Sequence, residues 1–211
     1  MRAYYSERMR FQHPFGVVTP SLDGEVLYVL ARADAWFTAP MVTAKLGNRS
    51  VEGVRRVLAR LVAEGVVKRE STSPVPLYRF NRMHLAASAI IAIATQRDEF
   101  VRRLGAVFDE WSSPPVYAAI FGSAASGTMA SDSDIDLLIV RPEPAGAGWH
   151  DDVASLAAQA SRWTGNDVRP LEYGERELGS VAEEPVLRDI AREGITVFGD
   201  RAWFRRMVDA T

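Results

Sequence analysis

The first eighty residues alternate hydrophobic and polar positions with the rhythm of three helices followed by two short strands. Apolar residues recur at steps of three and four, the spacing of one helix face. Ser50 stands directly before the third helix as a predicted N-cap. A Ser-Thr-Ser-Pro turn then separates two strand-like runs. The expected elements are helices over 24–35, 38–46 and 51–63 and strands over 66–70 and 77–80.

A further helical region joins the two halves of the chain. Residues 83–111 contain no glycine before Gly105 and keep a helical spacing of apolar side chains. Ser-Ser-Pro-Pro at 112–115 breaks this pattern, because proline disfavours a helical residue before it. We therefore expect a connecting helix over 83–113, packed between domains or against a second subunit.

Two short apolar runs in the second half predict neighbouring buried strands. Residues 116–121 and 135–141 are rich in β-branched or aromatic residues and are bounded by Gly, Pro and Ser. Side chains alternate across a strand, so Asp134 and Asp136 point to the same face. Two adjacent carboxylates at the start of a buried strand repel unless a cation neutralises them, and a hard divalent cation is the usual partner. The pair predicts a Mg²⁺ site.

The turn Gly122-Ser123 follows the first of these runs and adds the means to bind a phosphate. Glycine lets the backbone approach an anion closely, and serine adds a hydroxyl and an amide donor. Residues 124–128 are expected to open a short helix whose N-terminus faces the anion. Phosphates on amides and magnesium on paired aspartates together describe a nucleotidyl-transfer site.

This pattern resembles the minimal nucleotidyltransferases of the DNA polymerase β superfamily, which carry a hydrophobic-Gly-Ser, a spacer and Asp-x-Asp. The resemblance runs over about residues 116–200 and includes Ser133-Asp134-Ile135-Asp136-Leu137 and the closing segment 187–195. It implies an α+β fold, with a mixed sheet flanked by helices, that transfers a nucleoside monophosphate from an NTP to a hydroxyl. Asp134 and Asp136 would hold Mg²⁺, and Gly122 and Ser123 would hold the phosphates.

In this family a third carboxylate often comes from the strand expected here over 167–173. Asp167 is the candidate for this third catalytic acid. The alternative is that the family position falls one pleat later, on Arg169, which would leave two acids. Glu172 lies on the opposite face if the strand is regular.

The three helices and hairpin resemble the winged helix-turn-helix domains of bacterial regulators. The resemblance implies that the third helix enters the major groove and that the wing contacts phosphates. The residues expected at DNA are Arg49, Ser50, Arg55 and Arg56 on the helix and Lys68 and Arg69 on the wing. The alternative is a protein-interaction module with these arginines on a solvated face. Charge favours nucleic acid, because residues 1–85 carry 13 Lys and Arg against 7 Asp and Glu, and the remainder carry 12 against 20.

The amino-acid composition excludes several classes of protein and of functional site. The absence of cysteine excludes disulfides, thiolate nucleophiles and zinc-thiolate sites. The proportions of 47% hydrophobic and 25% charged residues are ordinary for a folded globular protein. No apolar run approaches the roughly 20 residues of a membrane span, and the first residues do not form a signal peptide. We therefore expect a cytoplasmic protein with no membrane partner.

These patterns predict four segments: a DNA-binding domain at 1–82, the connecting helix at 83–113, a nucleotidyltransferase domain at 114–200 and a tail at 201–211. The first functional hypothesis is an NTP-dependent transferase whose acceptor is a small molecule, a protein or tRNA. The second is a transcriptional regulator or antitoxin-like protein whose nucleotidyltransferase-like domain is a non-catalytic sensor or partner module. A homodimer is expected because winged-helix regulators often read paired half-sites.

Overall fold

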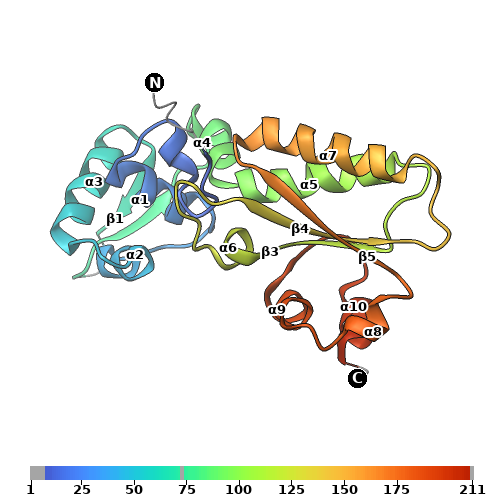
Figure 1. The fold of residues 1–211 in the computed structure, drawn as a ribbon. Coiled ribbons are helices and arrows are strands. Elements are labelled where there is room, and N and C mark those ends of the chain that lie inside the picture. Colours follow the sequence, from blue (N-terminus) through green and yellow to red (C-terminus); the bar gives the residue numbers. More distant parts are fainter. Residues whose placement is uncertain (1–7, 72–73, 210–211) are drawn as a thin grey trace, which may run out of the picture. The chain divides into compact units, whose positions relative to one another are not determined.

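The computed structural model describes residues 8–71 and 74–209, which form two compact units (Figure 1). One unit consists of residues 13–96. The other consists of residues 97–209 together with the short segment 8–12. No helix within the described ranges has both the length and the apolar character needed to cross a membrane.

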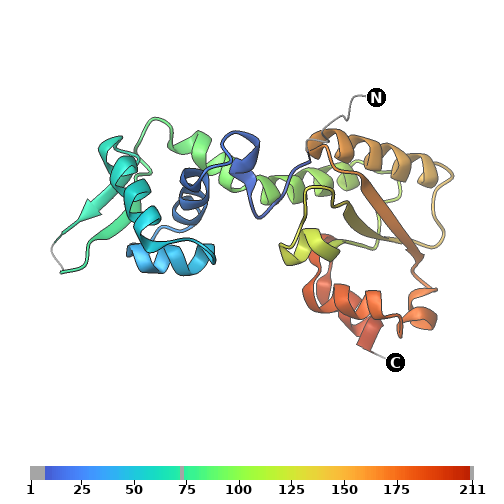
Figure 2. The same ribbon diagram turned by 60° about the vertical axis from the view of Figure 1, so that its left-hand side comes forward.

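The N-terminal unit contains helices and one β-hairpin in the order that the hydrophobic pattern predicts. Its elements are η1 (Pro14–Val17), α1 (Leu22–Ala31), α2 (Ala39–Leu46), α3 (Val51–Ala63), β1 (Val67–Glu70), β2 (Leu77–Phe80) and α4 (Ala87–Ala94). The two strands pair antiparallel, with Val67 opposite Phe80 and Glu70 opposite Leu77. Figure 2 shows this hairpin extending away from the helices of the unit.

Capping side chains and a shared core fix the helices of this unit. The Thr38 hydroxyl accepts a hydrogen bond from the Met41 amide, and the Ser50 hydroxyl accepts one from the Gly53 amide, so α2 and α3 begin where a cap is available. The inward side chains of α3 lie at helical spacing and are buried with those of α1, α2 and the hairpin. The fully buried members include Val26, Leu30, Val42, Val54 and Leu58.

The C-terminal unit is a four-stranded mixed sheet with helices on both faces. Its elements are α5 (Gln96–Asp109), β3 (Tyr117–Phe121), α6 (Gly122–Ser126), β4 (Ile135–Arg141), α7 (Trp149–Thr164), β5 (Val168–Gly174), α8 (Leu178–Val181), α9 (Pro185–Glu193), β6 (Ile195–Gly199) and α10 (Arg201–Asp209). The strand order is β5-β4-β3-β6. Only the β4–β5 pair is parallel, and α7 supplies its crossover. Pro170 is accommodated because β5 is an edge strand.

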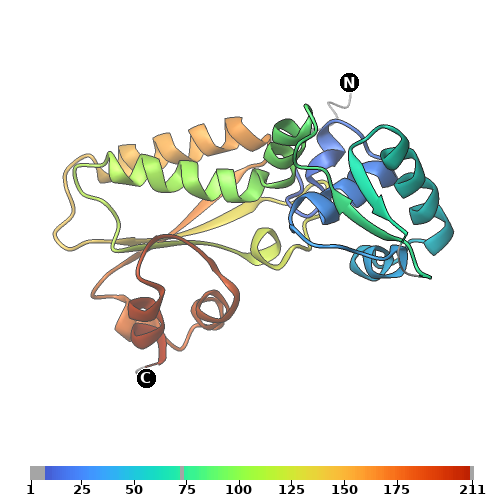
Figure 3. The same cartoon turned by 180° about the vertical axis from the view of Figure 1, so that it is seen from behind.

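Alternation along the strands produces two separate cores. Ile135, Leu137 and Ile139 of β4 face α5 and α7, which cover one side of the sheet (Figures 1 and 3). Leu138 and Val140 face α8, α9 and α10 on the other side. Asp136 lies between Ile135 and Leu137 along the strand, so its side chain points to the opposite face of the sheet, the face that α9 covers.

Two segments differ from the pattern expected from the sequence. The region 83–113 forms two helices in place of one, because Thr95 leaves the helical conformation between α4 and α5. The side chains of α4 join the core of the N-terminal unit, whereas those of α5 join the sheet of the C-terminal unit. Residues 201–209, expected as a tail, form α10, whose Phe204 is fully buried and stacks on Tyr117 at 4.5 Å between ring centroids.

Gly199 offers a test of the packing of β6 against β3. It has φ +80°, and a Cβ atom there would overlap the Val116 carbonyl oxygen. This oxygen belongs to the backbone and cannot move independently of β3. We expect Gly199→Ala to reduce the free energy of unfolding by about 2 kcal/mol or more, measured by urea denaturation. Gly179→Ala, where no atom lies within 4 Å of the added group, should change it little, and equal effects of the two variants would contradict this account.

Candidate functional site

The turn after β3 lies directly against the acid pair of β4. Gly122 begins α6 with φ +64°, a conformation that favours glycine. A Cβ atom on Gly122 would lie 2.6 Å from Oδ2 of Asp136, and the register places Phe121 opposite Asp136. The turn and the carboxylate thus meet with no side chain between them.

Ser123 stands in the first turn of α6. Its carbonyl oxygen accepts hydrogen bonds from the amides of Gly127 and Thr128, each at 3.1 Å, which hold the short helix closed. Its hydroxyl makes no hydrogen bond within residues 8–71 and 74–209. The hydroxyl is therefore available to an anion placed against the turn.

Asp134 and Asp136 lie side by side, as their spacing predicts. Asp136 is half-buried, and burial raises the pKa of its carboxyl above the usual range. The negative charge of Asp134 raises this pKa further, whereas the nearby Arg169 acts in the opposite direction. The surroundings of Asp136 thus disfavour the ionised form of its carboxyl.

Arg169 projects from β5 into the acid pair. The parallel register places Arg169 next to Asp136, and Nη1 of Arg169 lies 2.6 Å from Oδ2 of Asp134. Nε of Arg169 donates a hydrogen bond of 3.1 Å to Oδ2 of Asp167. This bond raises the pKa of Arg169, and the charge of Asp134 raises it further. The guanidinium is a permanent cation that joins two of the three candidate acids.

A second arginine reaches Asp134 from the beginning of the chain. Nη1 of Arg8 donates to Oδ1 of Asp134 at 3.3 Å and also contacts the carbonyl oxygen of Asp132. The amide of Met9 donates to Oδ1 of Asn166 at 2.9 Å, which anchors this segment to the sheet unit. Nothing in the sequence indicates Arg8, because it is separated from Asp134 by 126 positions.

Asp167 does not join the other two acids in a common cluster. Its side chain is 56% exposed, and Arg169 contacts both Asp167 and Asp134. In the described ranges no three acidic or histidine side chains converge closely enough to hold a metal ion. Glu172 is on the opposite face, where it accepts a hydrogen bond of 2.6 Å from the Trp149 indole of α7.

The donor set therefore does not fit a three-carboxylate metal cage. Both oxygens of Asp134 have guanidinium partners, and Asp167 is bound to one of the same guanidiniums. Of the three candidate acids, only Asp136 has no ion pair within the described part of the chain. Binding of Mg²⁺ by Asp134 and Asp136 therefore stays a prediction from the sequence.

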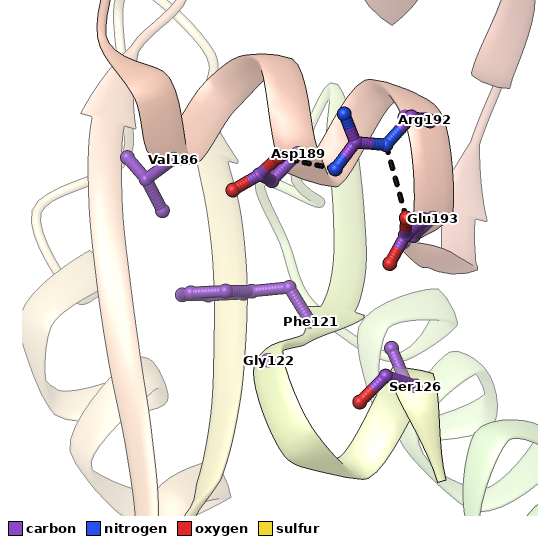
Figure 4. Close-up of a pocket in the computed structure, with 9 residues that line it drawn as sticks. Phe121, Gly122, Ser126, Val186, Asp189, Arg192 and Glu193 are labelled. Carbon is purple, nitrogen blue, oxygen red and sulfur yellow. Dashed lines mark hydrogen bonds and ion pairs between the residues drawn. The ribbon is translucent and has the colours of Figure 1, made fainter. Parts of the chain in front are cut away.

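A hollow of about 450 Å³ opens beside the turn, between α6 and α9. Its lining consists of Phe121, Gly122, Ala125, Ser126, Val186, Asp189, Arg192, Glu193 and Gly194. Figure 4 shows the flat ring of Phe121 and the Val186 side chain on one side, with Arg192 paired to Asp189 and Glu193 above Ser126. Gly122 lines the hollow and also adjoins Asp136, so the hollow lies next to the acid pair.

The basic residues expected at DNA have different environments in the N-terminal unit. Arg49 is held by Glu25 through two hydrogen bonds, one of 2.7 Å, and this contact lowers the pKa of Glu25. The Ser50 hydroxyl caps α3. The remaining four are exposed, namely Arg55, Arg56, Lys68 and Arg69, and the first two lie 3.9 Å from Glu52.

Comparison with known proteins finds one family model that matches part of the chain. Residues 104–192 match the model of the nucleotidyltransferase domain family. No curated protein matches the chain.

Among solved structures, a toxin–antitoxin crystal structure with AMP-PNP shares 16% identity and a TM-score of 0.37, and the match covers 55% of this chain and 81% of that chain. A proposed nucleotidyltransferase from Sulfolobus solfataricus shares 20% identity and a TM-score of 0.29, with coverages of 48% and 78%. An archaeal chromatin protein with a novel mode of DNA binding shares 13% identity and a TM-score of 0.26, with coverages of 82% and 72%.

The raised pKa of Asp136 gives a stability test. A carboxyl with a raised pKa in the folded state contributes stability below its unfolded pKa of about 3.9 and loses it as the pH rises through the folded value. We expect Asp136→Asn, which mimics the neutral form, to raise the melting temperature by a few degrees at pH 7 and by little near pH 3.

The matched control is Asp134→Asn, which removes an acid paired with two arginines. It should not raise the melting temperature at pH 7. A lower melting temperature for Asp136→Asn at pH 7 would show that the ionised carboxylate is stabilised by its surroundings.

Proposed function

We propose that this chain, whose residues 104–192 match the nucleotidyltransferase domain, binds a nucleoside triphosphate in its C-terminal unit and DNA in its N-terminal unit. The proposed activity is transfer of a nucleoside monophosphate from the NTP to a hydroxyl acceptor. The observation that carries this proposal is the contact between the Gly122 turn and Asp136. It brings a phosphate-binding backbone to the carboxylates on which such a transfer depends.

The residues around the turn support a role for each part of the nucleotide. The phosphates would lie against Gly122 and the Ser123 hydroxyl, which has no hydrogen-bond partner in the described part of the chain. The adjacent hollow, at about 450 Å³, is within the size range of small-ligand pockets, and the Phe121 ring offers an apolar face to a base. The net negative charge of Asp189, Arg192 and Glu193 would favour a group that donates hydrogen bonds.

In the proposed reaction the acceptor hydroxyl oxygen forms a bond to the α-phosphorus. The bond from this phosphorus to the bridging oxygen breaks, and pyrophosphate leaves with the electron pair. The hydroxyl proton passes to a carboxylate. Asp136 is the best candidate to accept it, since burial and the charge of Asp134 raise its pKa and it has no ion-pair partner in the described residues. We keep Asp167 as the other candidate for this role.

A second candidate function is favoured by one observation, the contact of Arg169 with both Asp134 and Asp167. An arginine among the acids is unusual for a site that must hold cations. Such an arginine suits a domain that binds a nucleotide without catalysing transfer of its nucleoside monophosphate. The chain would then be a DNA-binding regulator or an antitoxin-like protein with an NTP-sensing module. Pyrophosphate release with NTP separates the two functions, since a sensor would bind NTP and release none.

The proposal that the N-terminal unit binds DNA rests on the exposed basic side chains of α3 and β1. Arg55 and Arg56 have side chains 60% and 77% exposed, and their contacts with Glu52 at 3.9 Å are weak. Lys68 and Arg69 lie on the strand that follows α3. Together they would supply phosphate contacts beside a helix of the length that fits the major groove.

The first test is thermal stability with each NTP, with and without Mg²⁺. We expect a rise in melting temperature for the wild-type protein, because a ligand at about one hundred times its Kd stabilises by about 2.7 kcal/mol. Asp134→Asn combined with Asp136→Asn should reduce the rise. The control is Asp109→Asn with Glu110→Gln, which makes the same charge change at two exposed positions, the last residue of α5 and the residue after it. Absence of a shift with every NTP would contradict nucleotide binding.

The second test concerns DNA. Arg55→Gln combined with Arg56→Gln should weaken binding to duplex DNA and lower the slope of log K against log salt by about 2, since each phosphate contact contributes about 0.9. Arg102→Gln combined with Arg103→Gln is a matched control, an adjacent exposed pair in the other unit. An unchanged slope in the first variant would remove α3 from the proposed interface.

A further inference from the structure

Charge around Asp134 is nearly balanced by the chain itself. Asp134 and Asp136 lie side by side, and Asp167 is linked to Asp134 through the guanidinium of Arg169. A second arginine, Arg8, also contacts Asp134. The local formal charge is therefore −1, where the three acids alone would give −3. A divalent cation approaching Asp134 would meet one guanidinium at each of its oxygens.

We infer that Arg169 is a built-in counter-ion that keeps divalent cations off the acid pair until an anionic ligand draws its guanidinium away. This inference rests on the proposed function, in which the ligand is the triphosphate of an NTP. It assigns to Arg169 the control of metal access to the site.

The fold gives Arg169 this position through the sheet. The parallel β4–β5 register sets Arg169 beside Asp136, and the contact to Asp134 at 2.6 Å follows from that neighbour relation. Asp167, two residues earlier on the same face, binds the same guanidinium through Nε at 3.1 Å. The guanidinium of Arg169 is thus held by Asp134 and by Asp167.

The same side chain is placed where it can change partners. The Arg169 side chain is 61% exposed, whereas that of Asp134 is 22% exposed, so the guanidinium is much more open to solvent than the acid. A guanidinium binds phosphate oxygens in the same two-pronged geometry in which it binds carboxylates. A triphosphate on the Gly122–Ser123 turn would compete for Arg169 and release Asp134, so NTP and divalent cation should bind cooperatively.

The experiment is a titration of the full-length protein with Mn²⁺ alone, followed by electron paramagnetic resonance. Arg169→Gln removes the charge and keeps a polar side chain of similar length. We expect this variant to bind Mn²⁺ about tenfold more tightly than the wild-type protein, because it removes a positive charge in contact with a ligating oxygen. An equal Kd for the two proteins would overturn the inference.

The control for net charge is Arg176→Gln. Arg176 lies in the same unit with an 82% exposed side chain and pairs with Glu143 at 3.4 Å. It should leave the Mn²⁺ Kd unchanged, and a gain equal to that of Arg169→Gln would show that net charge alone explains the effect and would overturn the inference. Adding Asp134→Asn and Asp136→Asn to Arg169→Gln should abolish the gain, and a gain that survives would place the metal elsewhere and also overturn it.

The outcome is separate from that of the proposed function. If Arg169→Gln gains Mn²⁺ affinity and no NTP shifts the melting temperature of the wild-type protein, the counter-ion role of Arg169 stands and nucleotide binding fails. If NTP stabilises the wild-type protein and Arg169→Gln gains nothing, nucleotide binding stands and the role of Arg169 fails.

Discussion

The register between β3, β4 and β5 determines which chemical groups meet at the candidate site. Antiparallel pairing sets Phe121 opposite Asp136, and parallel pairing sets Arg169 beside the same residue. One row across the sheet therefore carries the glycine turn, the acid and the arginine. A slip of one residue in β5 would send Arg169 to the opposite face, towards α7, and would leave Arg8 as the remaining cation at Asp134 in the described part of the chain.

The sequence predicts the parts of the site that depend on local spacing. The acid pair follows from alternation along one strand, and the turn follows from a glycine at the end of another. The contact between Arg169 and Asp134 depends on register, which a single sequence leaves undetermined, so Asp167 and Arg169 had to remain alternatives. Arg8 gives no local signal of any kind. The helix α3, which has a clear apolar rhythm, has the range expected from the sequence.

The missed elements are those whose pattern is short or interrupted. The break at Thr95 has no proline or glycine to mark it, and the apolar rhythm continues through it. In α10, by contrast, Phe204 and Val208 stand four residues apart and are both buried. This spacing is typical of the buried face of a helix, but the segment is short and lies close to the end of the chain, so its pattern covers few turns.

Arg8 lies outside every helix and strand, yet it contributes charge to the centre of the sheet unit. A shortened form of the protein beginning at Met9 would keep each element of the fold and would lose the partner of Oδ1 of Asp134. Arg8 is thus a determinant of the chemistry of a site that lies more than one hundred residues further along the chain.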